Sequence, residues 1–202
     1  MRILSALACD YGRKGCDPHQ QDGLTLGPHS CLRLEGMWEG AVQSLVVGES
    51  MCFVFSAGRL SPRHERLCDL QAQWVKDRWA KQGWNGEPFI VIPNTDAYWG
   101  SKAEIEFLGQ VAGQFVYEWE TLPVVEVMTE DYHRPRVEFL VYRLGLSMVV
   151  LEVSSADYPP TAEELWHERR AYFAEQWLPR KVVRWLQQMS RTVRARRYGL
   201  AR

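Results

Sequence analysis

Residues 127–136, with the sequence VMTEDYHRPR, join a short apolar run (residues 123–128) to an amphipathic segment (residues 137–146). An apolar run, a polar turn and then a helical period are typical of a parallel strand that leads into a crossover helix. The turn holds a hydroxyl group, two carboxylates, an imidazole and two guanidinium groups. Because open α/β sheets bind ligands at the carboxyl ends of their strands, this stretch predicts both a fold and the place of a site.

The same alternation extends along most of the chain. Apolar runs typical of strands lie at residues 2–8, 51–55, 88–93, 123–128 and 146–153. Helical spacing or a helix-start signal marks the segments beginning at residues 32, 61, 101, 137 and 164. Strands that alternate with helices favour βαβ units and a parallel sheet. We therefore expect one doubly wound α/β domain over residues 1–178, with a mainly parallel five-stranded sheet. Residues 9–30 are expected to form one long loop.

Composition fits a soluble globular protein. A chain of 202 residues can bury an ample core, and no window approaches the roughly 18 consecutive apolar residues of a membrane span. The first eight residues lack a secretory signal pattern, so we expect a cytoplasmic location. The five cysteines are an odd number in a mid-sized chain, which disfavours a disulfide framework.

The C-terminal segment differs in charge from the rest of the chain. Residues 180–202 hold eight basic residues and no acidic one, which leaves 16 of the 24 basic residues against all 25 acidic ones, a balance of −9. Residues 179–202 are therefore predicted to form a basic helical extension. It can be a solvated helix end, or it can contact an acidic partner or an anionic membrane surface. Nucleic acid is disfavoured because the acidic body would repel it.

Four segments resemble, in the same order, the YdcF-like family of bacterial proteins, whose relatives include the SanA and ElyC envelope proteins. They are Arg33-Leu34, Ser56-Ala57-Gly58 with Glu65, Ser101 with Glu104, and Thr129, His133 and Arg136 followed by a helix ending at Gly145. The resemblance spans most of residues 2–155, and only the last segment is specific. It implies a Rossmann-like three-layer α/β/α fold, with S-adenosylmethionine or another nucleotide-like molecule as a candidate ligand. Three departures from the family pattern are Ala57, Gly100 and Glu130.

His133 and Arg136 are the first candidates for binding a ligand. Three residues apart at a predicted helix start, they share one face, where the helix dipole already favours anions. Thr129 can donate a further hydrogen bond. His133 is also the best general acid or base, because its unperturbed pKa of about 6.5 suits proton transfer near neutrality. Alternatively, Asp131 caps the helix and His133 is an ordinary, partly buried imidazole.

Two further strand ends carry candidate residues. Asp10 follows the first strand, where a carboxylate suits a ribose hydroxyl, a metal ion or general base catalysis. Ser56 and Gly58 follow the second apolar run, so their backbone N–H groups could contact the same ligand. The alternative is a strand-to-helix turn in which glycine only relieves the backbone angles. Arg33, at the start of the first helix, would help to neutralise an anionic ligand.

The remaining candidates have simpler alternatives. Glu65 could orient Arg33 or Arg136, or could merely stabilise the first turn of its helix. Ser101 and Glu104 could belong to the site, but a capping box explains both. One loop holds five soft metal ligands (Cys9, Cys16, His19, His29 and Cys31), but their spacing matches no standard zinc pattern, so no metal is predicted.

The sequence therefore predicts a binding site for a small anionic or nucleotide-like ligand, with Asp10 and His133 as the candidate catalytic residues. Hydrolysis or group transfer at a phosphate-bearing substrate is one expectation. The motifs GxGxxG, GxxxxGK[ST] and GxSxG are all missing, which counts against the usual dinucleotide, P-loop and α/β-hydrolase sites. The alternative is a non-catalytic scaffold that contacts a partner through its basic extension, and the three family departures favour it.

Overall fold

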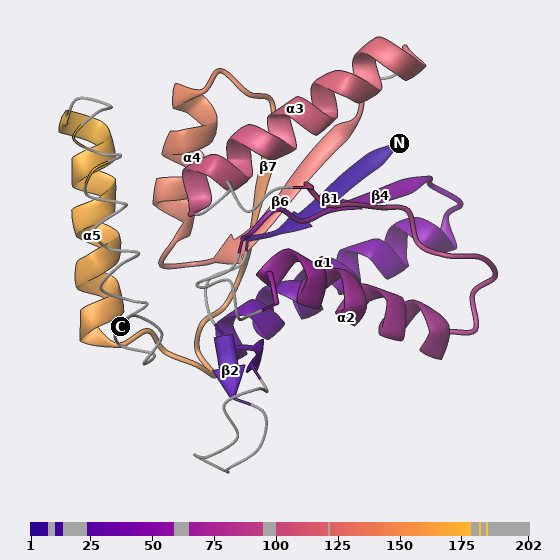
Figure 1. Cartoon of the computed structure of the whole chain (residues 1–202), viewed down its shortest axis with the longest axis horizontal. Coiled ribbons are helices and arrows are strands. Elements are labelled where there is room, and N and C mark those ends of the chain that lie inside the picture. The colour runs from indigo at the N-terminus through magenta and orange to yellow at the C-terminus, as the bar shows by residue number, and fades with distance from the viewer. Residues whose placement is uncertain are drawn as a thin grey trace.

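The computed structural model describes residues 1–7, 11–13, 24–58, 65–94, 100–120 and 122–178, together with residues 182 and 185. Figure 1 shows the chain as one α/β unit in which strands and helices alternate. The elements in chain order are β1 (Arg2–Ala6), β2 (Tyr11–Arg13), β3 (Leu24–Leu26), α1 (Pro28–Val46), β4 (Met51–Val54), α2 (Leu67–Lys81), β5 (Ile90–Val91), α3 (Ser101–Trp119), β6 (Val124–Glu130), α4 (Arg134–Arg143), β7 (Val149–Val153) and α5 (Ala162–Trp177).

The main sheet has five parallel strands in the order β5-β4-β1-β6-β7. The chain runs outward from β1 through β4 to β5 and then returns to the other side of β1, where β6 begins. In the register, Ser5 lies opposite Val127 and Ala6 opposite Met128. The direction of winding therefore reverses between β1 and β6, which makes this pair the switch point of the sheet. The predicted α/β fold with a parallel five-stranded sheet is confirmed.

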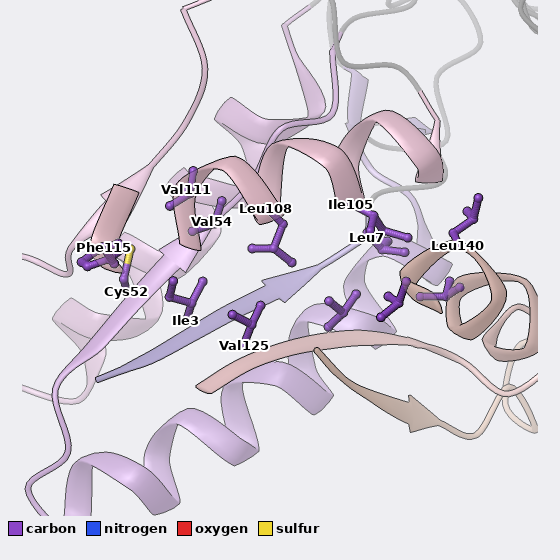
Figure 2. Packing of buried hydrophobic residues seen from close by; sticks show 13 residues of the cluster. Ile3, Leu7, Cys52, Val54, Ile105, Leu108, Val111, Phe115, Val125 and Leu140 are labelled. Carbon is purple, nitrogen blue, oxygen red and sulfur yellow. The ribbon is translucent and has the colours of Figure 1, made fainter. Parts of the chain in front are cut away.

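One face of the sheet is covered by α3 and α4. Figure 2 shows Ile3 and Val125 of the strands packed beneath Leu108 and Val111 of α3, and Leu140 of α4 further along the layer, near Ile105 and Leu7. Alternate side chains of a strand point to opposite faces, so the odd-numbered residues of β1 and β6 build this layer. The apolar period of α3 closes it against water.

The opposite face is covered by α1 and α2 (Figure 1). Leu4 and Phe53 of the strands are buried there against Trp38 of α1, whose ring stacks on Phe53 at 6.3 Å between centroids. Gly36 lets α1 pass very close to β7, because a Cβ at this position would lie 2.2 Å from Val153 Cγ1. The two covered faces make the three layers of a Rossmann-like fold.

Helix α5 lies outside α4 rather than on the sheet (Figure 1). The ring of Tyr172 on α5 meets Phe139 of α4 edge to face, with 5.3 Å between centroids. The helix starts at a capping box, in which Thr161 and Glu164 each accept the other's backbone N–H. In the described part of the chain, no helix has both the length and the apolar character needed to cross a membrane.

Several predicted boundaries are wrong. Thr129 and Glu130, expected in the polar turn, are the last two residues of β6, which pair with β7. Residues 9–30 were expected to form one loop, but they contain the antiparallel pair β2–β3 and the start of α1. Residues 59–64, with the predicted cap at Ser61, lie outside the description, as does nearly all of the extension at residues 179–202.

Candidate functional site

The carboxyl ends of β1 and β6 carry a cluster of buried polar side chains. At these ends, the backbone N–H of Leu7 donates to the Met128 carbonyl oxygen at 3.2 Å, so the two strand ends are held side by side. Side chains of α1, β6, α3 and α4 converge on this edge. The position agrees with the edge predicted from residues 127–136.

Arg33 and Glu130 form the centre of the cluster. Both side chains are buried, with exposed fractions of 2% and 0%. The Arg33 guanidinium donates from Nε and one Nη to Glu130 Oε2, at 3.0 and 2.6 Å, and from its other Nη to the Leu7 carbonyl oxygen at 2.9 Å. His29 Nδ1 lies 2.6 Å from the second Glu130 oxygen. Arg33 therefore ties α1 to both strands at the switch point.

His133 lies between two side chains from other helices. Its Nε2 is 3.0 Å from Ser101 Oγ, and its Nδ1 is 2.6 Å from Glu168 Oε1 on α5. Although the two atoms are close, Glu168 Oε1 has no aligned hydrogen-bond partner among the described residues. Burial lowers the pKa of His133, as do the charges of Arg33 and Arg136, although Glu168 opposes them. The imidazole is therefore held neutral near pH 7.

Arg136 contacts carboxylates of α5. Its Nε and one Nη bind the two Glu175 oxygens at 2.8 and 2.7 Å, and its other Nη binds Glu168 Oε2 at 3.1 Å. Burial lowers the pKa of Arg136, but these carboxylates outweigh it and raise the pKa above the ordinary value. Burial also raises the pKa of Glu168, yet His133 and Arg136 reverse this and keep it ionised. The positive charge of Arg136, which was predicted to meet an anionic ligand, is thus neutralised by carboxylates of the protein.

The capping box predicted at Ser101 is wrong. Gly100 is the N-cap residue of α3, no side chain caps this end within the described residues, and Ser101 is the first helical residue. Gly100 has φ 89° and ψ 154°, a conformation that glycine alone adopts readily. The Ser101 hydroxyl meets His133 instead of the helix backbone. Glu104, one turn later, is buried with 5% of its surface exposed.

The predicted cap of α4 is also wrong. His133 is the N-cap residue and contributes no side-chain cap, while Asp131 accepts from the Ser155 hydroxyl at 2.6 Å and from the Tyr132 N–H at 2.8 Å. These bonds lower the pKa of Asp131, the Ser155 hydroxyl having the largest effect. Asp131 thus fastens the turn after β6 to the end of β7.

Ser56 and Gly58 follow β4 and are buried at the same edge of the sheet. The carbonyl oxygens of Ala57 and Gly58 accept the N–H groups of Cys68 and Leu67, at 3.0 and 3.2 Å, so this turn feeds the start of α2. Glu65 is exposed. The role predicted for it, orienting Arg33 or Arg136, is carried out by Glu130 and by the carboxylates of α5.

Besides Glu168 Oε1, two buried polar atoms at the strand ends have no hydrogen-bond partner among the described residues. They are Thr129 Oγ1, at the end of β6, and Gln71 Oε1, whose Nε2 donates to the Ala6 carbonyl oxygen at the end of β1 at 2.7 Å. Both side chains have an exposed fraction of 0%. Thr129 was predicted as a donor, whereas Gln71 was missed because a polar residue on a long helix carries no sequence signal of burial.

Four other residues of the cluster were not predicted to be members of the site, because nothing in the local sequence indicates their partners. His29 was weighed only as a metal ligand, Glu130 only as a departure from a family pattern, and Glu168 and Glu175 not at all. Glu168 and Glu175 occupy one face of α5, seven residues apart, which is two helical turns. The spacing of these two glutamates is visible in the sequence, but the sequence does not show that this face of α5 packs against α4.

Asp10 lies outside the described residues, as do Cys9, Cys16 and His19. Within the described ranges, no three His, Cys, Asp or Glu side chains are grouped as metal ligands would be. Scans against models of known protein families and against curated proteins found no match to this chain. The resemblance to the YdcF-like family therefore stays a prediction.

The buried imidazole predicts how stability depends on pH. We expect the free energy of unfolding to fall as the pH is lowered from about 7 to about 5, because the pKa of His133 is below its ordinary 6.5 and the unfolded chain takes up the proton first. One proton limits the slope to about 1.4 kcal/mol per pH unit. Urea denaturation at several pH values measures it.

The matched comparison is between two histidines. His133→Gln should flatten the slope, whereas His167→Gln, at an exposed position beside Glu163, should leave it unchanged. A wild-type stability that stays level or rises on acidification would contradict the assignment.

Proposed function

We propose that this protein binds a small nucleotide-like ligand across the carboxyl ends of β1 and β6. The observation that carries the proposal is that Thr129 Oγ1 and Gln71 Oε1, both buried there, have no hydrogen-bond partner in the part of the chain that the structure describes. An unsatisfied buried group costs about 1–3 kcal/mol, so such groups are rare without a reason. Thr129 offers a donor and Gln71 an acceptor, which suits a ligand with hydroxyl or amino groups such as a nucleoside.

The charges of the cluster narrow the chemistry of the ligand. Arg33 is paired with Glu130, and Arg136 with Glu168 and Glu175. Each guanidinium is therefore already compensated by carboxylate, which weakens the case for a strongly anionic ligand. A nucleoside with a neutral or cationic substituent fits better, and S-adenosylmethionine, with its sulfonium, is the candidate of that kind.

The proposed ligand is the one that the resemblance to the YdcF-like family implies. If a reaction follows, His133 is its acid or base, and the reaction is a group transfer or a hydrolysis. Ser56 and Gly58, at the neighbouring strand end, would contact the ligand through their backbone N–H groups. Arg33 would hold the two strand ends rather than meet a phosphate.

Thermal unfolding with S-adenosylmethionine or adenosine tests the proposal. A ligand at 100 times its Kd stabilises by about 2.7 kcal/mol, which for a chain of this size raises Tm by about 5–10 °C. Thr129→Val should weaken binding of the ligand about fivefold, because one hydrogen bond is worth about 1 kcal/mol, and should leave the free protein at least as stable.

Ser44→Ala is the matched control, since Ser44 is also a buried hydroxyl but accepts from Arg2 at the opposite edge of the sheet. It should leave the ligand-induced shift unchanged. The proposal fails if neither ligand raises Tm, or if Thr129→Val and Ser44→Ala have the same effect on the shift.

A second candidate function is a non-catalytic scaffold. Helix α5 presents Trp166, Phe173 and Trp177 to solvent, with exposed fractions of 53%, 60% and 68%. Large exposed aromatics are frequent at protein and membrane contacts. Together with the basic residues of 180–202, they would suit an acidic protein or an anionic membrane surface. Binding that is lost on truncation after residue 178, in a protein that no small ligand stabilises, would favour this function.

A further inference from the structure

Three side chains from three different helices form a line at the strand ends. Ser101 opens α3, His133 is the N-cap of α4, and Glu168 lies in the middle of α5. The distances along the line are 3.0 Å from Ser101 Oγ to His133 Nε2 and 2.6 Å from His133 Nδ1 to Glu168 Oε1. Hydroxyl, imidazole and carboxylate in this order are the parts of an activated nucleophile.

The protonation states follow from the partners. An ionised carboxylate can only accept, so Glu168 favours the neutral imidazole with its proton on Nδ1. The Nε2 lone pair then faces the Ser101 hydroxyl, which must donate its proton toward it. Arg136 holds Glu168 in place through the opposite carboxylate oxygen at 3.1 Å. The imperfect alignment of Glu168 is usual in a site without substrate.

The backbone around Ser101 suits a nucleophile. Ser101 follows Gly100, whose φ of 89° turns the chain sharply into α3, and a Cβ at Gly100 would meet no atom within 4 Å. The N–H groups of a first helical turn lack acceptors within the helix, and the dipole adds positive potential there. A developing oxyanion beside Ser101 would therefore be stabilised.

A purely structural role for Ser101 and His133 explains fewer of these contacts. A serine at the start of a helix ordinarily caps the backbone, yet Ser101 lies one residue inside α3, and its hydroxyl contacts the His133 imidazole, which can act as a base near pH 7. The contacts also come from segments far apart in the sequence. Burial of His133 keeps it unprotonated, which a base requires.

We infer that Ser101 is the nucleophile of an ester-cleaving centre, with His133 as its base and Glu168 as a positioning residue. The substrate class is an uncharged or cationic carboxylic ester, because Arg33 and Arg136 are already paired with carboxylates of the protein and would not compensate the charge of an anionic phosphoester. The inference rests on the proposed use of His133 as a base at the ligand site.

The reaction has two balanced steps. Ser101 Oγ attacks the ester carbonyl carbon while its proton passes to His133 Nε2, and the tetrahedral intermediate collapses as the bond to the alcohol oxygen breaks and Nε2 returns the proton to it. Water then attacks the acyl-serine, gives a proton to Nε2, and the Ser101 Oγ–C bond breaks as Oγ takes that proton back. The products are an alcohol and a carboxylic acid.

The test uses p-nitrophenyl acetate as substrate and a fluorophosphonate as covalent probe, on the full-length chain. We expect one adduct per molecule, located at Ser101 by peptide mass spectrometry, with labelling faster above than below the pKa of His133. Ser101→Ala should abolish the adduct and reduce hydrolysis at least about 100-fold. Glu168→Gln should lower kcat with little change in KM and alter the pH profile, since it no longer fixes the imidazole.

Ser44→Ala, a buried serine at the opposite edge, is the control and should keep full labelling and hydrolysis. The inference is overturned if the wild-type protein is not labelled, if the adduct lies elsewhere, or if Ser101 supports cleavage of p-nitrophenyl phosphate rather than acetate. A Tm shift with S-adenosylmethionine that persists in Ser101→Ala, without any ester cleavage, would sink this inference and leave the proposed ligand site standing. Labelling at Ser101 without any Tm shift on addition of S-adenosylmethionine would support this inference and contradict the proposed ligand site.

Discussion

Replacing Arg33 by methionine should lower the free energy of unfolding by about 3–5 kcal/mol. The substitution keeps most of the side-chain volume but leaves the Glu130 carboxylate, with an exposed fraction of 0%, without its guanidinium partner. It also removes the donor to the Leu7 carbonyl oxygen. Chemical denaturation measures the effect, as a lower midpoint with an unchanged slope.

The control for this prediction is Arg134→Met. Arg134 pairs with Glu138 and Glu152 at the surface, where solvent screens ion pairs, so its replacement should change stability little. The double variant Arg33→Met with Glu130→Leu should recover a large part of the loss, because it removes both charges together. Equal effects of Arg33→Met and Arg134→Met would show that the buried pair does not hold the switch point.

Replacing Arg136 by methionine should cost a similar amount, about 3–5 kcal/mol, because it leaves two carboxylates of α5 unpaired. Glu175 is almost fully buried, with 3% of its side chain exposed, and loses both of its bonds to the guanidinium. The damage should be concentrated in α5, which lies outside α4 and makes few apolar contacts with it. Hydrogen exchange should therefore rise more in α5 than in the sheet.

Arg170→Met is the matched control on the same helix. Arg170 stacks over the exposed Trp166 ring at 5.0 Å, an arrangement worth about 0.5–1 kcal/mol. It should neither release α5 nor change the environment of His133. Unchanged hydrogen exchange of α5 in Arg136→Met would contradict the view that this arginine fastens the helix and its Glu168 to the site.

These two predictions concern residues whose roles differ from those that the sequence indicated. Arg33 and Arg136 were expected to meet an anionic ligand, and each instead meets glutamate. The structure places Arg33, Ser101, Thr129 and His133 around the ends of β1 and β6. The partners of Arg33 and Arg136 could not be predicted from the sequence, because this requires knowing which helices pack together.

The Ser101 turn illustrates the same limit. Ser101 and Glu104 match the local pattern of a capping box, and a similar pattern at Thr161 and Glu164 forms one. At Ser101 the hydroxyl contacts His133, 32 residues away in the sequence. A local rule cannot distinguish the two cases, because the competing partner arrives only when α4 packs beside α3.

By itself, the sequence determined the alternation of strands and helices, the parallel sheet and the edge that carries the polar residues. These features depend on short-range periodicity, and parallel strands must end at a common edge whatever their order. Only the tertiary structure decided that β6 lies next to β1, that Glu130 belongs to a strand, and that α5 supplies carboxylates to His133 and Arg136. Those contacts join residues distant along the chain, and their energy comes from burial and charge pairing that exist only once the layers have packed.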